Sequence, residues 1–350
     1  MPSSISSSDP ASARVRRRWP LAALGALALF FAAEQALWSS PAWLRFCARY
    51  APPGPGDPLL VTARGGLLPE GGGAPPVLLV GSSQIREGLD CAVFEAALPG
   101  RPCANLATGG GSPLDTLFVA RRTARRWPHR LVVTGVFPKV LHMEPKPAFT
   151  DLATARCVLA GGGWRRTGTD TWLGLAYGLL GGVSETLRDR DALRALRDSV
   201  GGEWRRAWRG ELPAQPDRLL AGEAAQADRY FDNRLGLVDF DSRPNRFTAA
   251  QERALDALVA RENAGGNAVV VVDFPTRPGY ETTLPPETVA HYEAFRARLH
   301  ARTDAIVVRA DQLPALALAD FLDFTHLSPS GREKVSRRMA EVAAAARSGR

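Results

Sequence analysis

Lysine is nearly absent from this chain of 350 residues: only Lys139, Lys146 and Lys334 are lysines among 44 basic residues. The other basic residues are arginines, and they are spread over the whole length together with 33 glycines and 27 prolines. This bias is typical of a GC-rich genome. A nucleic-acid-binding protein is expected to gather its basic residues on one stripe or in a recognisable motif. The composition therefore argues against nucleic acid as a partner, in spite of a net charge of +8.

The chain also lacks the motifs of common cofactor sites. Neither G-x-G-x-x-G nor G-x-x-x-x-G-K-[ST] occurs, which argues against a flavin or nucleotide binder. Only four cysteines are present, and no two have the C-x-x-C spacing of a structural zinc site. We therefore predict no cofactor and no metal. With 45% hydrophobic and 23% charged residues, the composition is that of an ordinary globular protein rather than a disordered, collagenous or polytopic membrane protein.

Long apolar runs are scarce, and the one near the N-terminus, residues 21–33, follows four arginines. With Trp19 and Trp38 at its ends, the wider segment 19–38 has the roughly 20 residues that a membrane-spanning helix needs. Arginines before the segment place the N-terminus in the cytoplasm. We predict a basic cytoplasmic tail at 1–18 and a single-pass signal-anchor in the inner membrane, with the C-terminal domain extracytoplasmic. A cleaved signal peptide and a buried core helix are the alternatives.

Proline and glycine are dense after the anchor, which predicts a linker over residues 39–75 and a folded domain over 76–345. Within this domain, short apolar runs typical of strands buried on both faces alternate with helical segments. The predicted strands are 77–80, 103–106, 131–133, 268–272 and 306–308. The predicted helices are 87–97, 112–126, 249–263, 286–302 and 328–345. This alternation predicts an α/β fold with three α/β/α layers around a parallel sheet.

Two further expectations concern the covering of the sheet and the cysteines. Residues 156–247 contain helix-like pieces without a strong strand signal, which predicts a helical insertion over one side of the sheet ends. Ligand crevices of open α/β sheets lie at those ends. Cys91 and Cys103 flank a predicted helix, so in an exported protein they are expected to form a disulfide that joins the helix start to the next strand.

The turn Gly81-Ser82-Ser83-Gln84 directly follows the first predicted strand. In open α/β sheets this turn lies at the carboxyl end of the sheet, where ligands bind. A serine there presents its hydroxyl to solvent, and backbone N–H groups of the following helix start can face a developing oxyanion. The alternative is that the serine only caps the helix.

A serine nucleophile needs a base, and the chain has only five histidines. His326 follows Asp323 by three residues on the segment before the last helix. On an irregular loop this spacing lets the carboxylate hold the imidazole Nδ1 while Nε2 faces a serine. His142, which follows a predicted strand, is a minor candidate. The other histidines are expected on loops or on the surface: His129, His291 and His300.

Three segments, in this order along the chain, resemble the first, second and fifth blocks of the SGNH (GDSL-type) hydrolase superfamily. They are Gly81-Ser82-Ser83, the stretch Asn105-Leu-Ala-Thr-Gly-Gly-Gly-Ser112, and Asp323-x-x-His326-Leu-Ser-Pro-Ser-Gly331. The resemblance covers the sheet-forming part of residues 76–345 and implies a flavodoxin-like sheet.

The resemblance also implies the roles of individual residues. Ser83 would be the nucleophile, His326 the base and Asp323 the acid that orients it, in one acyl-transfer site. The N–H groups of Ser83 and Gly110 would bind the oxyanion. No metal takes part in such a site.

Two departures from the family pattern bear on function. The first block reads Gly-Ser-Ser instead of Gly-Asp-Ser, and Gly135-Val136-Phe137-Pro138 stands where many members have Gly-x-Asn-Asp, whose asparagine helps to bind the oxyanion. Asn105 is the candidate substitute for that donor. With the N-terminal anchor and the insertion, these departures are similar to membrane-anchored envelope proteins of the superfamily, which act in teichoic-acid D-alanine transfer and in alginate O-acetylation.

Two functions follow as hypotheses. In the first, the protein is an extracytoplasmic serine esterase or O-acyltransferase that acts on ester groups of a cell-envelope polysaccharide through an acyl-serine, beside a multispanning membrane acyltransferase. In the second, it is a catalytically weak accessory protein that binds the polymer or docks to that acyltransferase. Ester turnover by the chain itself separates the two.

Overall fold

The structure is a computed structural model. It describes residues 10–50, 61–62, 74–124, 127, 129–143, 145, 152–160, 193–194, 196–198 and 247–348.

A five-stranded, all-parallel sheet forms the centre of the protein, in the order β2-β1-β3-β4-β5. Its strands are β1 (Val77–Leu79), β2 (Cys103–Asn105), β3 (Leu131–Val136), β4 (Ala268–Asp273) and β5 (Ile306–Val308). All five were predicted, and the α/β class is confirmed. The strand order is compatible with a flavodoxin-like fold. β3 and β4 run to Val136 and Asp273, beyond the predicted ends, because they pair with each other over their whole length.

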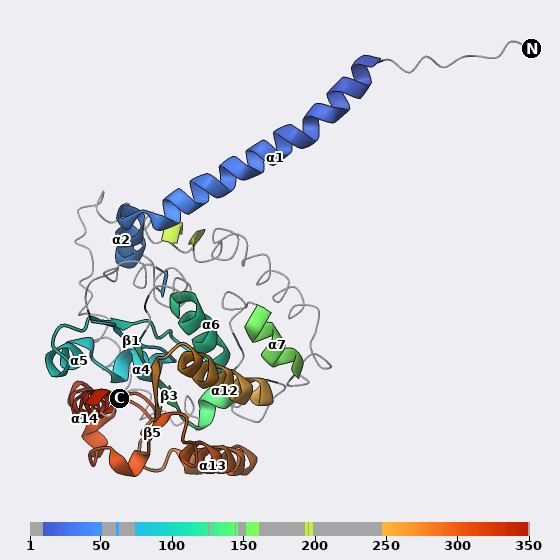
Figure 1. Ribbon diagram of the computed structural model, residues 1–350. Helices are drawn as coiled ribbons and strands as arrows, with labels where there is room; N and C mark the ends of the chain where they lie inside the picture. Colours follow the sequence, from blue (N-terminus) through green and yellow to red (C-terminus); the bar gives the residue numbers. More distant parts are fainter. Residues whose placement is uncertain are drawn as a thin grey trace, which may run out of the picture.

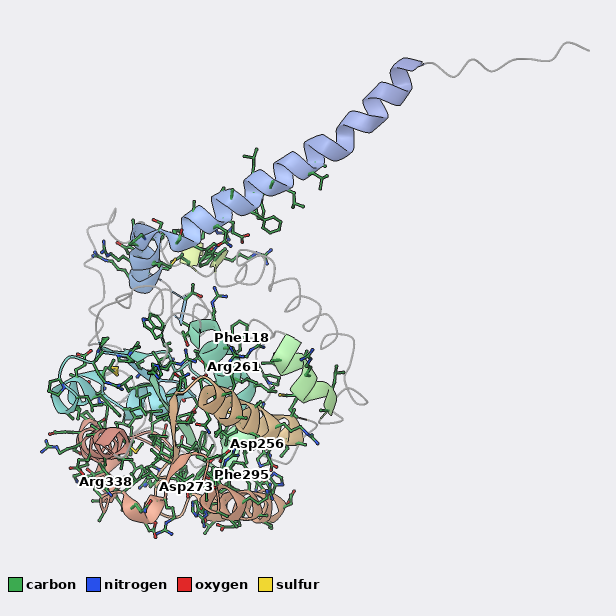
Figure 2. All side chains as sticks on the ribbon, viewed as in Figure 1. Phe118, Asp256, Arg261, Asp273, Phe295 and Arg338 are labelled. Atoms are coloured by element: carbon green, nitrogen blue, oxygen red, sulfur yellow. A yellow bond between two sulfur atoms is a disulfide. The ribbon has the colours of Figure 1, made fainter. Side chains whose placement is uncertain are left out.

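Helices cover both faces of this sheet and give the three predicted layers (Figure 1). α5 (Cys91–Ala97) lies beside α14 (Pro329–Ser348), and the backbone N–H of Asp90 donates to Ser336 Oγ between them at 2.9 Å. On the other face α6 (Pro113–Ala124) packs beside α12 (Thr248–Ala264), and α13 (Pro286–His300) follows β4. Apolar side chains of the strands and of these helices fill the space between the layers (Figure 2).

The single helix predicted over residues 87–97 is wrong. Two short helices stand there: α4 (Ser83–Gly88), which begins four residues earlier, and α5. Leu89 and Asp90 between them are extended, and the Asp90 side chain accepts from the N–H of Ala92 as the N-cap of α5. Gly88 lies against the ring of Phe274, so that a β-carbon there would come within 2.3 Å of the ring. Phe274, just beyond β4, therefore leaves room only for glycine at the last position of α4.

At the N-terminus, α1 (Pro10–Ser39) contains the whole predicted anchor segment 19–38 and projects away from the body of the protein (Figure 1). Within the part of the chain that the structure describes, no single helix has both the length and the hydropathy needed to cross a membrane. The helical segments Ala23–Ser39 and Pro41–Cys47 have them only when taken together, and the chain bends by 69° between them. α2 (Pro41–Tyr50) shows that the first part of the predicted linker 39–75 is helical.

Most of the predicted insertion 156–247 lies outside the described residues. Its first residues belong to α7 (Leu152–Ala160), which packs beside α6 and α12. Residues 193–194 and 196–198 are helical.

The predicted disulfide between Cys91 and Cys103 is present and ties the start of α5 to β2. Cys47 and Cys157 take no part in this bridge and are buried. Because the bridge closes a short loop between two core elements, replacing both of its cysteines by serine is expected to lower the free energy of unfolding by about 2–3 kcal/mol, as measured with urea.

Thiol labelling provides the control for this expectation. When the unreduced chain is unfolded, iodoacetamide should modify Cys47 and Cys157 alone. Modification of all four cysteines without a reductant contradicts the bridge.

A buried ion pair lies beside the amino ends of β3 and β4, at the end of the sheet opposite the turn that carries Ser83. The guanidinium of Arg130 donates to both oxygens of the Glu262 carboxylate, with Nη2 2.6 Å from Oε1 and Nε 2.9 Å from Oε2. Both side chains are fully buried. Nη2 also donates to the carbonyl of Ala120, and Asn267 Nδ2 donates to Glu262. This network links α6, α12 and the starts of two central strands.

Candidate active site

Ser83 lies at the carboxyl end of the sheet, directly after the turn that joins β1 to α4. Ser82 is the N-cap of α4 with extended backbone angles, yet its side chain makes no capping hydrogen bond. The Ser82 hydroxyl donates instead to Gln84 Oε1. Ser83 is the first residue of α4, so its side chain is not a helix cap either. The structure therefore does not support the alternative interpretation, in which Ser83 only caps the helix.

The second half of the site comes from the loop before α14. An isolated antiparallel bridge between Phe321 and Leu327 closes this loop, and the N–H of Leu322 donates to the carbonyl of His326 at 2.8 Å. Inside the loop, Asp323 Oδ1 accepts from the N–H groups of Thr325 and His326, each at 2.7 Å. The carboxylate thus holds the backbone of its own loop and keeps Oδ2 for another partner.

Ser83, His326 and Asp323 form one chain of hydrogen bonds. Ser83 Oγ lies 2.8 Å from His326 Nε2, and His326 Nδ1 lies 2.6 Å from Asp323 Oδ2. Ser83 and His326 are 243 positions apart in the chain, whereas Asp323 and His326 are only three apart. The structure therefore brings together all three side chains that the sequence singled out, in the order nucleophile, base and carboxylate.

The electrostatics favour a histidine that accepts a proton. Burial lowers the pKa of His326, but the hydrogen bond and negative charge of Asp323, aided by the charge of Glu87, outweigh it and leave the pKa above the usual 6.5. Burial raises the pKa of Asp323, yet the hydrogen bond and charge of His326 and the two N–H donors bring it below its usual value. Asp323 thus stays ionised and stabilises the imidazolium.

These shifts predict distinct titrations for two histidines. NMR of the histidine rings should show His326 protonating above pH 6.5, while His142, whose pKa burial and the charge of His291 lower to about 4, stays neutral down to acidic pH. Asp323→Asn should move the His326 titration to lower pH, because it removes the charge that stabilises the imidazolium. A His326 that titrates below 6.5 in the unmodified protein contradicts this electrostatic picture.

The loop after β2 packs directly on the serine turn. A β-carbon on Gly111 would lie 2.6 Å from the carbonyl oxygen of Gly81, and the N–H of Thr108 donates to that same oxygen at 2.9 Å. Gly110 has a φ of 64°, a left-handed conformation that suits glycine. Among the described residues, no acceptor takes the N–H of Ser83 or of Gly110. Both are therefore available for an oxyanion, the role that the resemblance implies.

Asn105, the suggested substitute for a missing oxyanion donor, is used elsewhere. Its Nδ2 donates to the carbonyl of Arg86 at 2.9 Å, and its Oδ1 accepts from the N–H of Ala107 at 3.2 Å. The side chain thus joins the end of β2 to α4. We assign it a positioning role and do not retain it as an oxyanion donor.

The segment after β3 supplies no amide side chain to the site. The short 3₁₀ helix η1 (Pro138–His142) follows β3, and Phe137 before it is 1% exposed and part of the hydrophobic core. The residue at the asparagine position of the pattern that the sequence resembles, Phe137, thus packs in the core.

The remaining histidines lie away from Ser83. His142 is buried, with Nδ1 3.1 Å from Thr248 Oγ1 and its ring 5.4 Å from that of His291. His291 also pairs with Glu252, and His300 lies 3.3 Å from Asp273. His142 therefore belongs to the packing between η1, α12 and α13 and is not a second base for Ser83.

Two charged residues at the site were not predicted: Arg86 and Glu87 of α4. They follow Ser83 by three and four positions, the spacing at which helix residues share a face. Arg86 Nη2 lies 2.6 Å from Glu87 Oε1, and Glu87 Oε2 lies 3.8 Å from His326 Nε2. This spacing from Ser83 could have predicted that both side chains lie beside the serine. It has that meaning only if the helix begins at Ser83, and the sequence pattern predicted a start at residue 87.

Comparison with known proteins assigns no family. No family model and no curated protein matches this chain. The chemistry open to the site follows from its geometry, which has the arrangement required for nucleophilic attack by a serine hydroxyl on an acyl carbon.

A metal centre has no support in the described part of the chain. No group of three or more histidine, cysteine, aspartate or glutamate side chains within it is placed to hold an ion. His326 instead contacts Ser83 through Nε2 and Asp323 through Nδ1.

Proposed function

We propose that the protein is a serine esterase or O-acyltransferase of the SGNH type that forms an acyl-enzyme at Ser83. The observation that carries this proposal is the continuous hydrogen-bond chain from Ser83 Oγ through His326 to Asp323, with links of 2.8 and 2.6 Å. Neither a serine that caps a helix nor a histidine that only packs in the core requires hydrogen bonds from serine to histidine to carboxylate. The parallel sheet with its serine turn at the carboxyl end also supports it.

In the proposed reaction, His326 Nε2 takes the proton of the Ser83 hydroxyl as Oγ attacks the ester carbonyl. The N–H groups of Ser83 and Gly110 stabilise the oxyanion of the tetrahedral intermediate. The imidazolium then protonates the leaving alcohol, and the acyl group remains on Ser83. An acceptor hydroxyl or water reverses these steps and releases the acyl group.

The setting that we propose is the outer face of the inner membrane, with α1 as the anchor. Most of the large apolar side chains exposed in the described part of the chain lie on this helix: Leu24, Leu27, Leu29, Phe30 and Leu37. Water does not favour such a surface, whereas a lipid bilayer does. An ester-bearing envelope polysaccharide is the proposed substrate, and a multispanning membrane acyltransferase is the proposed partner.

A second candidate function is supported by the segment after β3. Because Phe137 is core and Asn105 is engaged with α4, neither position supplies the amide side chain that many SGNH proteins use for the oxyanion. Loss of one such donor costs about 3–4 kcal/mol of transition-state stabilisation in other enzymes. The alternative is therefore a catalytically weak protein that binds the polymer or docks to the acyltransferase. Co-purification with that partner that survives Ser83→Ala and His326→Ala would favour it.

Labelling with a fluorophosphonate probe tests the proposal. The probe reacts with serines whose hydroxyl is activated by a base, so the full-length chain should be labelled and the Ser83→Ala variant should not. Equal labelling of both proteins overturns the proposed function.

A further inference from the structure

The Arg86–Glu87 pair faces the triad, and in the acylation step described above Glu87 acts only through its charge on His326. Arg86 Nη2 lies 2.6 Å from Glu87 Oε1, so one carboxylate oxygen is occupied by the guanidinium. The other oxygen, Oε2, lies 3.8 Å from His326 Nε2, the nitrogen that accepts the serine proton. Glu87 thus presents a single oxygen beside the base.

The loop after β2 fixes this pair in place. Asn105 donates to the carbonyl of Arg86 and anchors its backbone. A β-carbon on Gly109 would lie 2.9 Å from Arg86 Nη1, so only glycine leaves room for the guanidinium where it lies. The side chains of Arg86 and Glu87 are 27% and 25% exposed, which leaves Glu87 open to a molecule that enters from solvent.

In the acyl-enzyme, Ser83 Oγ is esterified and carries no proton, so the neutral His326 Nε2 can accept a hydrogen bond from an entering molecule instead. An ionised Glu87 carboxylate is also only an acceptor. Two acceptors 3.8 Å apart can both be reached by hydrogen bonds of about 2.8 Å from one small molecule. That molecule needs two donors: the two hydrogens of a water, or the neighbouring hydroxyls of a vicinal diol. A simple alcohol has only one.

We propose that Glu87 is the acceptor-binding residue of the site and selects a nucleophile with two adjacent donors, as in water or the vicinal diol of a sugar. This inference rests on the proposed function. One hydroxyl of the acceptor gives its proton to His326 Nε2 as its oxygen bonds to the acyl carbon. The bond from that carbon to Ser83 Oγ then breaks, and Oγ takes the proton from Nε2. Glu87 keeps its charge throughout and holds the second donor.

The test separates formation of the acyl-enzyme from its breakdown. Full-length protein reacts with p-nitrophenyl acetate at a pH above the His326 titration, with water alone, cis-1,2-cyclohexanediol or cyclohexanol as acceptor. Release of p-nitrophenol reports acylation, and mass spectrometry of quenched samples reports loss of acetyl from Ser83. Glu87→Gln and Glu87→Ala are compared with Glu333→Gln, a matched change on the exposed face of α14.

We expect both Glu87 variants to lose acetyl about tenfold or more slowly than the unmodified protein, the usual effect of a hydrogen bond to a charged group. Acylation should be slowed less, because there Glu87 acts only through its charge on His326. Slowing with the diol but not with cyclohexanol supports a sugar-type acceptor. Slowing of hydrolysis alone supports water as the acceptor. Equal effects on both steps, or an unchanged loss of acetyl, overturn the inference and leave the proposed function standing. If the unmodified protein forms no acetyl-Ser83, the proposed function fails and the inference falls with it.

Discussion

Ser83→Ala and His326→Ala are each expected to lower kcat for ester turnover by about 1,000-fold or more, because each removes a group that acts only together with the other. The 2.8 Å contact between Ser83 Oγ and His326 Nε2 is the basis of this expectation. The double variant should be no worse than either single one, since residues that act as a unit are not additive. Steady-state kinetics with p-nitrophenyl acetate measure all three proteins.

Ser82→Ala is the matched control for this experiment. Ser82 is the neighbouring serine, almost fully buried, and its hydroxyl donates to Gln84 rather than to the histidine. Turnover of this variant should stay within about tenfold of the unmodified protein, the effect of one neutral hydrogen bond. If Ser82→Ala is inactive while Ser83→Ala retains turnover, the nucleophile is Ser82 and the assignment of Ser83 is wrong.

Glu262→Ala is expected to lower the free energy of unfolding by about 3–5 kcal/mol, because it leaves the guanidinium of Arg130 buried without its counter-charge. The pair is fully buried, and the carboxylate also accepts from Asn267. Unfolding of the purified chain in urea measures the loss.

Two comparisons make this prediction specific. Arg130→Met combined with Glu262→Leu should be less destabilising than Glu262→Ala, because it removes both charges and keeps apolar volume in the core. Glu333→Ala, which breaks an exposed pair with Arg337 on α14, should cost at most about 1 kcal/mol. A loss for Glu262→Ala no larger than for Glu333→Ala contradicts the assigned role of the buried pair.

Much of the fold was predictable because its strands are buried on both faces. The runs 77–80, 131–133 and 268–272 are continuous and apolar, and a strand of the sheet begins at the first residue of each. The break between α4 and α5 was not predictable, because the residues around it are compatible with one helix. At that break Gly88 packs against the ring of Phe274, which lies just beyond β4 and nearly 190 positions later in the chain.

The site shows the same division between local and distant contacts. Asp323 and His326 are three residues apart, so their contact follows from local spacing, and the serine turn follows from its place after β1. The role of Asn105 was misjudged because its partner is a backbone carbonyl on α4, to which no sequence pattern points. Arg130 also gave no signal, since its partner Glu262 lies 132 positions away.

Formation of an acyl-enzyme at Ser83 is the central claim, and peptide mapping after rapid mixing with p-nitrophenyl acetate tests it most directly. Acid quenching during turnover should trap an acetyl group on the peptide that contains Ser83, and the adduct should be absent from Ser83→Ala and strongly reduced in His326→Ala. An adduct on a different residue, or equal acetylation of the Ser83→Ala protein, would contradict the account.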